Sequence, residues 1–469
     1  MSNTRTTQVR LPSGPTADTA RPAHPGAALG VAMLGFFVVA LDSQVVNVAL
    51  PSIREDLGGG LAGLQWVVTG YTLMFSALIL FAGTFSERIG AKRAYGAGMV
   101  LFVLASAACG LAPDLGTLIA ARFAQGLGAA LVTPTALALI REAYADAGAR
   151  ARAIAYWAMG GSIAAAAGPI VGGALTQVDW RIIFFLNLPV GAIALLVLTR
   201  VGTSPREAAP FDWTGQVTAV LGLAALTYAI IEGGEGGYGR PVILTAFAVA
   251  VLALVVFLLA QSRGRHPMVP LELFRSRRVI VALAAAFIGM SAFYGVVFVQ
   301  SLYFQQVRGE SAFSTGLLFL PMTALVAAVS PVVPRVAARY GLRVPIIGGQ
   351  IVLVAGLIAL ACVPASTPTW VVAVLMVPVG LGGSFTVPPL TTLVIDSVPA
   401  RRAGTASGVL NMSRQMGGSL GVAAVGSVLA VQASFMTGLR IGLIALAALV
   451  VVTIVAGLTL RDADAATAN

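Results

Sequence analysis

The sequence has few charged residues for its length. Of its 469 residues, 10% are charged and 58% are hydrophobic, whereas an ordinary soluble domain has about 25% charged residues. So few charges do not cover the surface of a folded soluble protein of this size. The mean hydropathy of +0.91 agrees. The composition therefore excludes a soluble protein and predicts a polytopic membrane protein.

Lysine, cysteine and histidine are nearly absent. Lys92 is the single lysine among 29 basic residues, and Arg93 follows it. The chain therefore has no Gly-Lys-Ser/Thr phosphate-binding loop, and ATP is not expected to drive it directly. Cys109 and Cys362 fall in apolar runs, which is typical of small membrane-embedded residues rather than of a disulfide or a metal pair. With only two histidines, in the tail and a loop, we expect no metal, no cofactor and no enzymatic activity.

Long apolar runs are abundant. Each is about 20 residues long, the length that crosses a bilayer as a helix. Residues 1–26 are polar and proline-containing and predict a disordered tail. The fourteen apolar runs lie near 27–50, 63–85, 94–112, 115–140, 153–176, 183–200, 213–232, 241–260, 279–303, 313–334, 344–363, 370–395, 404–430 and 439–460.

The net charge of +11 reflects topology. The basic residues lie in short loops between apolar runs, so we expect no nucleic-acid partner. With the N-terminal tail in the cytoplasm, 22 basic residues fall on the cytoplasmic side, 5 on the outer side, and Arg122 and Arg414 within runs. Because basic loops stay inside, the sequence predicts a multi-pass protein of the cytoplasmic membrane with both termini cytoplasmic.

The chain also repeats itself. Residues 87–92, after the second run, match 338–343 at an offset of 251, and the Gly126–Pro134 segment matches Gly380–Pro388 at an offset of 254. This offset covers eight helices, so we expect a helix pair inserted between two six-helix halves. The predicted all-α organisation is a cytoplasmic tail at 1–26, a first half at 27–200, the inserted pair with its linkers at 201–262, a basic cytoplasmic loop at 263–278, a second half at 279–460 and a cytoplasmic tail at 461–469.

Four segments resemble signatures of the major facilitator superfamily, in particular of its fourteen-span drug:proton antiporters. They are a first-helix signature at 41–51, a cytoplasmic loop signature at 83–93, a fourth-helix motif at 122–130 and a fifth-helix antiporter motif at 168–173. The loop signature departs from the family in having Glu87 where Asp is usual. The resemblance covers about residues 27–460. It implies a monomeric transporter that exports small organic compounds, such as a drug or antibiotic, in exchange for protons by alternating access.

Asp42 is the one acidic residue deep within an apolar run. A charged group in the membrane is costly and points to function. At 1.5 Å per residue, Asp42 lies roughly 20 Å from the cytoplasmic face, and Arg122 lies at about the same depth. The two side chains are therefore expected to be partners. Two interpretations stay open, a role in proton coupling and an ion pair that only locks two helices together.

A second candidate site is the loop signature after the second run. We interpret it as a cytoplasmic latch, in which Glu87 meets the positive end of the thirteenth helix near Gly404. The alternative is an ordinary solvated cluster of charges. The residues of the predicted latch are Gly83, Glu87, Arg88, Gly90, Lys92 and Arg93.

The fifth run has small residues on successive turns. Gly168, Pro169, Gly172 and Gly173 permit close helix packing and a kink. The resemblance implies a hinge-like seal typical of exporters. Simple close packing is the alternative and does not exclude the seal.

Arg414 is the second deeply placed cation, roughly 18 Å into the thirteenth run. It cannot face lipid cheaply. It either contacts substrate or pairs with a carbonyl or carboxylate group. Asn411 and Gln415 flank it, so the three residues form a possible substrate pathway.

The partners that follow are a small-molecule substrate, protons and the lipid bilayer. The second half contains no deep acid, so neutral, zwitterionic or anionic compounds fit better than dications. Two other functions remain, an uptake carrier or facilitator of the same fold and a membrane sensor or scaffold. The first is disfavoured by the antiporter motif, by resemblance alone, and the second by the lack of a long soluble segment.

Overall fold

The computed structural model describes residues 24–206, 210–264, 266–399 and 402–459, and every regular element within them is helical. This fits the membrane, where a helix satisfies its own backbone hydrogen bonds. The helices of the first part of the chain are α1 (Pro25–Leu57), α2 (Leu61–Ile89), α3 (Ala91–Gly110), α4 (Leu115–Ala143), α5 (Ala147–Thr176), α6 (Ile182–Phe185), α7 (Asn187–Leu198), α8 (Trp213–Gly236) and α9 (Pro241–Arg263).

The second part of the chain has shorter and more interrupted helices. They are the 3₁₀-helix η1 (Leu271–Arg275), α10 (Arg277–Leu302), the π-helix η2 (Tyr303–Val307), α11 (Ala312–Leu318), α12 (Leu320–Val329), α13 (Val333–Tyr340), α14 (Arg343–Ala361), α15 (Thr369–Leu375), α16 (Val377–Asp396), α17 (Ala403–Val431) and α18 (Phe435–Leu458). η1 lies inside the basic loop predicted at 263–278.

The interruptions have a local cause. A proline stands in the first turn of each helix that resumes after a break: Pro189 in α7, Pro321 in α12, Pro334 in α13 and Pro378 in α16. Proline has no N–H to donate and its ring disfavours helical geometry in the preceding residue. Several predicted runs therefore appear as two or three consecutive helices.

Twelve helices of the described residues are long and apolar enough to cross a membrane, and Ile182–Leu198 is a shorter apolar helix. α17 is not among the twelve although it has 29 residues. The structure thus gives about twelve apolar helices, and the count of fourteen spans stays a prediction.

The ends of the chain differ in part from the prediction. α1 begins at Pro25, inside the tail predicted at 1–26. Residues 1–23 of that tail and the tail predicted at 461–469 lie outside the described residues. Cys109 is buried, whereas Cys362 is exposed where α14 ends, at the edge of its apolar run.

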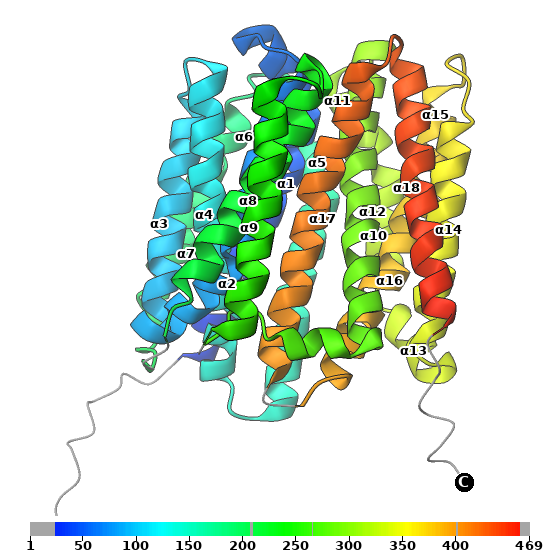
Figure 1. The fold of residues 1–469 in the computed structure, drawn as a ribbon. Coiled ribbons are helices and arrows are strands. Elements are labelled where there is room, and N and C mark those ends of the chain that lie inside the picture. Colours follow the sequence, from blue (N-terminus) through cyan, green and yellow to red (C-terminus); the bar gives the residue numbers. More distant parts are fainter. Residues whose placement is uncertain (1–23, 207–209, 265, 400–401, 460–469) are drawn as a thin grey trace, which may run out of the picture.

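The helices pack as two groups. The first group is α1 to α7 and the second is α10 to α18 (Figure 1). The two groups are in contact where α2 packs on α17 and where α5 packs on α11 and α12. The same close contact occurs in each group. A side chain on Gly128 would lie 2.9 Å from the Gly98 carbonyl oxygen where α4 crosses α3, and one on Gly382 would lie 2.7 Å from the Gly349 carbonyl oxygen where α16 crosses α14. These pairs follow the repeat offsets of 251 and 254.

Helices α8 and α9 stand beside both groups. α9 packs on α8, and α8 packs on α2 and α17 (Figure 1). The Trp66 indole N–H of α2 donates to Glu232 at 2.9 Å, and the Tyr238 hydroxyl is hydrogen-bonded to Ser427 of α17. The pair therefore lies where the two groups meet and bonds to both.

Candidate functional site

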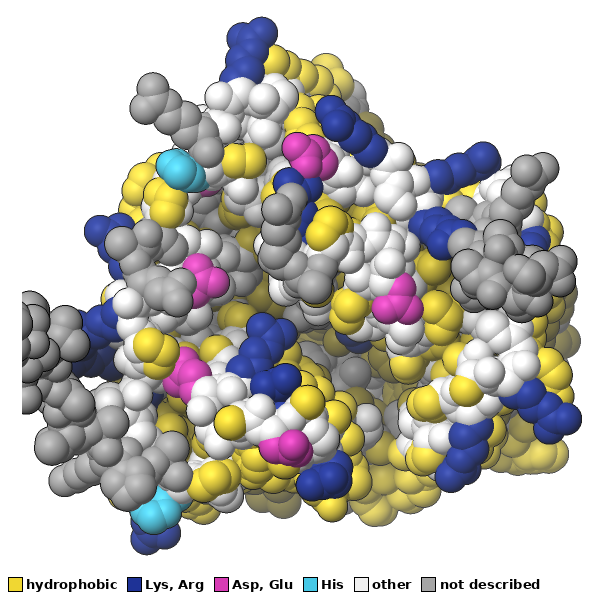
Figure 2. Space-filling model, turned by 90° about the horizontal axis from the view of Figure 1, so that it is seen from below, with side chains coloured by type: hydrophobic (Ala, Val, Ile, Leu, Met, Phe, Trp, Pro, Cys, Tyr) yellow, Lys and Arg dark blue, Asp and Glu magenta, His cyan; other side chains and the backbone are white. Residues whose placement is uncertain are grey.

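A large cavity lies between the two helix groups. Its volume is about 1050 Å³, and its walls come from α1, α2, α4 and α5 on one side and from α10, α12, α14, α16, α17 and α18 on the other. It reaches the end of the bundle where Gly83, Glu87, Arg141 and Gly404 lie, which we call the basic end. Figure 2 views this end, with a hollow near its centre and Lys and Arg side chains around it.

At the opposite end the two groups touch directly. Pro51 in α1 has no N–H, so the Asn47 carbonyl, four residues earlier, lacks its helical donor. The Ser301 hydroxyl of α10 donates to this carbonyl at 2.5 Å. The Gln305 amide donates to the neighbouring Val48 carbonyl at 2.9 Å. The first and second groups are thus hydrogen-bonded where the cavity ends.

The fifth-helix motif forms part of this closed seam. A side chain on Gly172 would lie 2.8 Å from the Val45 carbonyl of α1, and one on Gly173 would lie 2.4 Å from the Ala312 carbonyl of α11. Gly316 of α11 approaches the Pro169 carbonyl in the same way. No larger residue fits at these positions unless a helix moves, so the motif brings α5 close to α1 of its own group and to α11 of the second group.

Asp42 and Arg122 are in direct contact, as their predicted depths require. Arg122 Nη1 lies 2.5 Å from Asp42 Oδ2, and the side chains are 1% and 0% exposed. The second guanidinium contact is from Nε to the Val67 carbonyl at 3.0 Å. The Tyr71 ring lies 4.4 Å from the guanidinium carbon, in the arrangement of a cation–π contact.

Neutral side chains complete the environment of Asp42. Gln125 Nε2 of α4 and Asn187 Nδ2 of α7 each donate to Asp42 Oδ1 at 2.8 Å. Both amides also donate to the Ser106 hydroxyl, which in turn donates to the Phe184 carbonyl. The carboxylate therefore accepts hydrogen bonds from three donors, which tie α1 to α4 and α7.

The sequence did not single out Gln125, Asn187 or Ser106. Each is a common neutral residue, and no spacing rule shows which face of its helix it occupies. A depth argument applied to buried amides, rather than to charges alone, selects Asn187 because α7 carries no other strongly polar side chain.

The ion pair lies behind the cavity wall. Ser43 and Gln44 line the cavity, while Asp42 is turned toward α4 and α7. In α1 the buried Asp42 is therefore followed directly by two residues that line the space between the groups. A movement of α1 at this level therefore shifts both the Asp42–Arg122 pair and the cavity wall.

The loop signature packs on the segment that leads to α8. Gly90 has φ +90°, a conformation that favours glycine, and a side chain there would lie 3.1 Å from the Ser204 carbonyl. The Lys92 backbone N–H donates to Ser204 Oγ at 3.0 Å, and Arg88 lies over the Phe211 ring at 5.1 Å. Arg88, Gly90 and Lys92 of the predicted latch thus contact the segment between α7 and α8 rather than the second helix group.

Glu87 faces the cavity instead. Glu87 and Gly404 line it from α2 and α17, on its two sides. The residue before α17, Arg402, makes no side-chain cap and is paired with Glu272. Glu87 and the start of α17 thus both line the basic end of the cavity, from its two sides, and the latch role stays a prediction.

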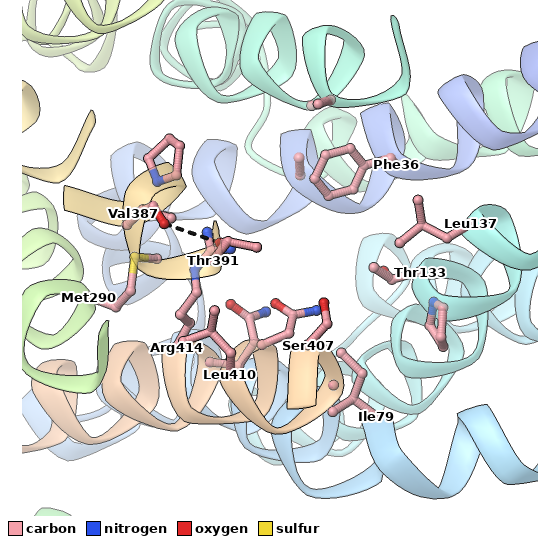
Figure 3. A pocket seen from close by; sticks show the side chains of 18 of the residues that line it. Phe36, Ile79, Thr133, Leu137, Met290, Val387, Thr391, Ser407, Leu410 and Arg414 are labelled. Atoms are coloured by element: carbon pink, nitrogen blue, oxygen red, sulfur yellow. Dashed lines mark hydrogen bonds between the residues drawn. The ribbon is translucent and has the colours of Figure 1, made fainter. Parts of the chain in front are cut away.

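Arg414, Asn411 and Gln415 all line the cavity. Figure 3 shows Arg414 extending from α17 toward Thr391 and Met290. Arg414 makes no hydrogen bond or ion pair with the described residues, and its Nε is buried without a partner. Of the two interpretations, pairing with a carbonyl or carboxylate is not observed in the described part of the chain.

The described residues contain no group of three or more His, Cys, Asp or Glu side chains that could hold a metal ion.

The chain belongs to the Major Facilitator Superfamily, whose family model matches residues 32–422. It is therefore a multi-pass membrane transporter rather than an enzyme. It is 41% identical to "Multidrug resistance protein Stp" of Mycobacterium tuberculosis over 85% of this chain and 74% of that protein. It is 36% identical to the "Methylenomycin A resistance protein" of Bacillus subtilis (87% and 88%) and 34% identical to the "Tetracenomycin C resistance and export protein" of Streptomyces glaucescens (85% and 74%).

Solved structures share the fold at low identity. A POT family transporter in complex with 5-aminolevulinic acid matches with a TM-score of 0.71 and 13% identity, covering 93% of this chain and 96% of that one. A D-xylose-proton symporter matches with a TM-score of 0.68 and 13% identity, covering 93% and 98%. These two structures support the all-helical major facilitator fold.

Proposed function

We propose that the protein exports small organic compounds across the cytoplasmic membrane in exchange for protons, by alternating access. The observation that carries this proposal is the buried Asp42–Arg122 pair, next in sequence to Ser43, which lines a cavity between two helix groups. The relatives named for antibiotic resistance or export favour efflux over uptake. An uptake carrier remains the competing function.

The arrangement of the helix groups supports alternating access. The cavity is open at the basic end and closed at the opposite end by α1–α10 and α5–α11 contacts. In the reverse state these contacts part, while the basic end closes. By the distribution of charge, the basic end is the cytoplasmic one, so the structure corresponds to a state that loads substrate from the cytoplasm.

Asp42 is the proposed proton carrier. Protonation removes its charge and with it the strongest reason for Arg122 Nη1, Gln125 and Asn187 to remain in place. These residues link α1 to α4 and α7, so a proton on Asp42 changes the packing of α1. Because Ser43 and Gln44 line the cavity, that change reaches bound substrate directly.

The membrane topology completes the proposal. Adding Ile182–Leu198 and α17 to the twelve apolar helices gives fourteen spans. In this arrangement α8 and α9 are the inserted pair between two six-helix halves, both termini are cytoplasmic and the protein acts as a monomer. Glu87 forms the cytoplasmic latch with the start of α17 when the basic end closes.

The test is accumulation of a fluorescent substrate in inside-out membrane vesicles. An acidic interior should drive uptake in the wild type, and the uncoupler that removes the proton gradient should release the accumulated compound. The matched control is Asp42→Asn, which keeps side-chain volume but carries no titratable proton. Export that ignores the gradient, or uptake in the reverse direction, would overturn the proposal.

A further inference from the structure

The cavity contains a cation that the protein does not neutralise. Arg414 faces the cavity from α17, and its Nε is buried without a hydrogen-bond partner. A buried N–H donor without a partner is costly because it has left water and gained no acceptor. Such a group is retained most simply where a ligand supplies the acceptors.

The acids nearby do not fill this need. Glu87 is the one carboxylate among the described residues that line the cavity, and it lies at the basic end together with Arg141. Asp42, the acid at the depth of Arg414, is hydrogen-bonded by Arg122 and two amides. The middle of the cavity therefore carries a net positive charge.

The apolar and aromatic residues of the cavity wall indicate what kind of ligand body fits there. Phe36 and Trp157 are stacked with ring centres 4.2 Å apart, and both line the cavity from the first helix group. Figure 3 shows Phe36 across the cavity from Arg414, with Ile79 and Leu137 at one side of the view and Met290 at the other. This wall fits a flat apolar body, since aromatic rings stack favourably.

Two further polar atoms of the wall lack partners. The Trp157 indole N–H is a buried donor, and Gln350 Oε1 is a buried acceptor. Together with Arg414 they offer more donors than acceptors. Oxygen-rich ligands satisfy such a wall better than amines do.

We infer that the cavity binds an organic anion with a planar apolar body, whose carboxylate, phenolate or enolate oxygen accepts from Arg414. This inference rests on the proposed transport function and deepens it by naming the substrate class. The aromatic stack of Phe36 and Trp157 holds the planar body. Arg414 belongs to the second helix group and the stack to the first, so one ligand spans both.

The charge of the substrate changes the energetics of exchange. A monoanion leaving the cytoplasm while one proton enters moves two charges in the same electrical direction. A monocation exchanged for one proton moves none. The membrane potential therefore drives anion export strongly and leaves one-to-one cation export unaffected.

The first test is calorimetric binding to the purified full-length protein. Three probes share one ring system and differ in the head group: 2-naphthoate, 2-naphthylmethanol and 2-naphthylmethylammonium. The wild type should bind naphthoate about tenfold or more tightly than the alcohol, as expected for one charge-assisted hydrogen bond. Tighter binding of the ammonium probe would overturn the inference.

Matched variants assign the preference to Arg414. Arg414→Gln should bring the naphthoate and alcohol affinities to within about twofold of one another, since the charge-assisted bond is lost. Arg414→Lys should keep part of the preference, and Arg240→Gln, exposed at the opposite end, should keep all of it. Unchanged alcohol binding shows that Arg414→Gln is folded. If that variant is not folded, the Arg414→Lys ratio decides: a ratio equal to that of the wild type overturns the role of the guanidinium fork.

The second test separates this inference from the proposed function. In inside-out vesicles, a positive-inside potential imposed with no pH gradient should drive naphthoate uptake in the wild type and not in Asp42→Asn. If Arg414-dependent binding is seen but no gradient drives uptake, the anion site stands and proton-coupled export fails. If the ammonium probe binds best and a pH gradient drives it, export stands and the anion site fails.

Discussion

Arg122 and Arg414 lie at similar depths, roughly 20 and 18 Å from the cytoplasmic face, but in opposite surroundings. Arg122 is 1% exposed and bonded to Asp42, Gln125 and the Val67 carbonyl. Arg414 faces the cavity and is bonded to no described residue. The first arginine belongs to the protein's own interior. The second arginine points its hydrogen-bond donors into the cavity between the helix groups.

The comparison teaches that depth alone does not assign a role to a membrane arginine. A cation whose donors are all used holds helices together, and its removal leaves a buried carboxylate alone. A cation with unused donors is available to a substrate. The number of satisfied donors, rather than the burial of the residue, separates the two cases.

The largest effect is expected at the partner of Arg122. Asp42→Asn should abolish proton-driven export, because the amide accepts hydrogen bonds but does not exchange a proton at physiological pH. It also leaves Arg122 without a counter-ion, which should destabilise the protein by about 3–5 kcal/mol. Vesicle efflux under a pH gradient and thermal unfolding measure the two effects.

The double variant Asp42→Asn/Arg122→Gln is the control for that experiment. It removes both charges and should recover much of the lost stability while remaining uncoupled. Proton-coupled efflux at the wild-type rate in either variant would leave the pair with a structural role only.

The next effect compares the two arginines directly. Arg122→Gln should lower the free energy of unfolding by about 3–5 kcal/mol, because Asp42 is left buried and unpaired. Arg414→Gln should leave it unchanged or raise it, because the substitution breaks no hydrogen bond to a described residue and removes the buried, unpartnered Nε donor. Unfolding of the purified proteins, followed by tryptophan fluorescence, checks both. Equal destabilisation by the two substitutions would contradict the assignment of Arg414 to substrate.

A smaller effect is expected at the mouth of the cavity. Glu87→Ala should shift the population toward the state open at the basic end, by roughly two- to thirtyfold, since a carboxylate at a helix N-terminus contributes about 0.3–2 kcal/mol. Maleimide labelling of cysteines placed at the basic ends of α2 and α17 reports the shift, after Cys109 and Cys362 are replaced. Glu87→Asp should be mild. Labelling that does not change would reduce this loop to a cluster of topological charges.

The smallest effect is expected at Glu232, which bonds one donor at the edge of the bundle. Glu232→Gln keeps an oxygen acceptor for the Trp66 indole, so the loss is about 1 kcal/mol or less and coupled export should persist. Efflux from vesicles under a pH gradient measures this. A loss as severe as that of Asp42→Asn would place Glu232 in the proton pathway and α8 within the transport mechanism.

The pairing of Asp42 with Arg122 was predictable because deep charges are so few in this chain. Helix rise converts sequence position into depth, and it places Asp42 and Arg122 at one level, where a buried ion pair is plausible. The amides of Gln125 and Asn187 were not predictable in this way, since neutral side chains occur at every depth. The sequence could not predict that Arg414 has no hydrogen-bond partner among the described residues. It allowed a carbonyl or carboxylate partner, and only the packing around α17 shows that none is in reach.

The overall architecture was likewise predictable only in part. Apolar runs, the repeat and proline positions predict helices and their order, whereas the breaks in α11 to α13 and in α15 and α16 appear only in three dimensions. The attachment of α8 to α17 was also beyond the sequence, because a contact between positions almost two hundred residues apart leaves no periodic signal.

The position of α8 has a consequence for how the protein is made. Gly234 and Tyr238 meet Ser427 of α17, which leaves the ribosome almost two hundred residues later. Until then this face of α8 has only α2 and α9 as neighbours. The bond to α17 therefore forms only after α17 has been made, and a polypeptide that stops before α17 leaves this face of α8 unfilled.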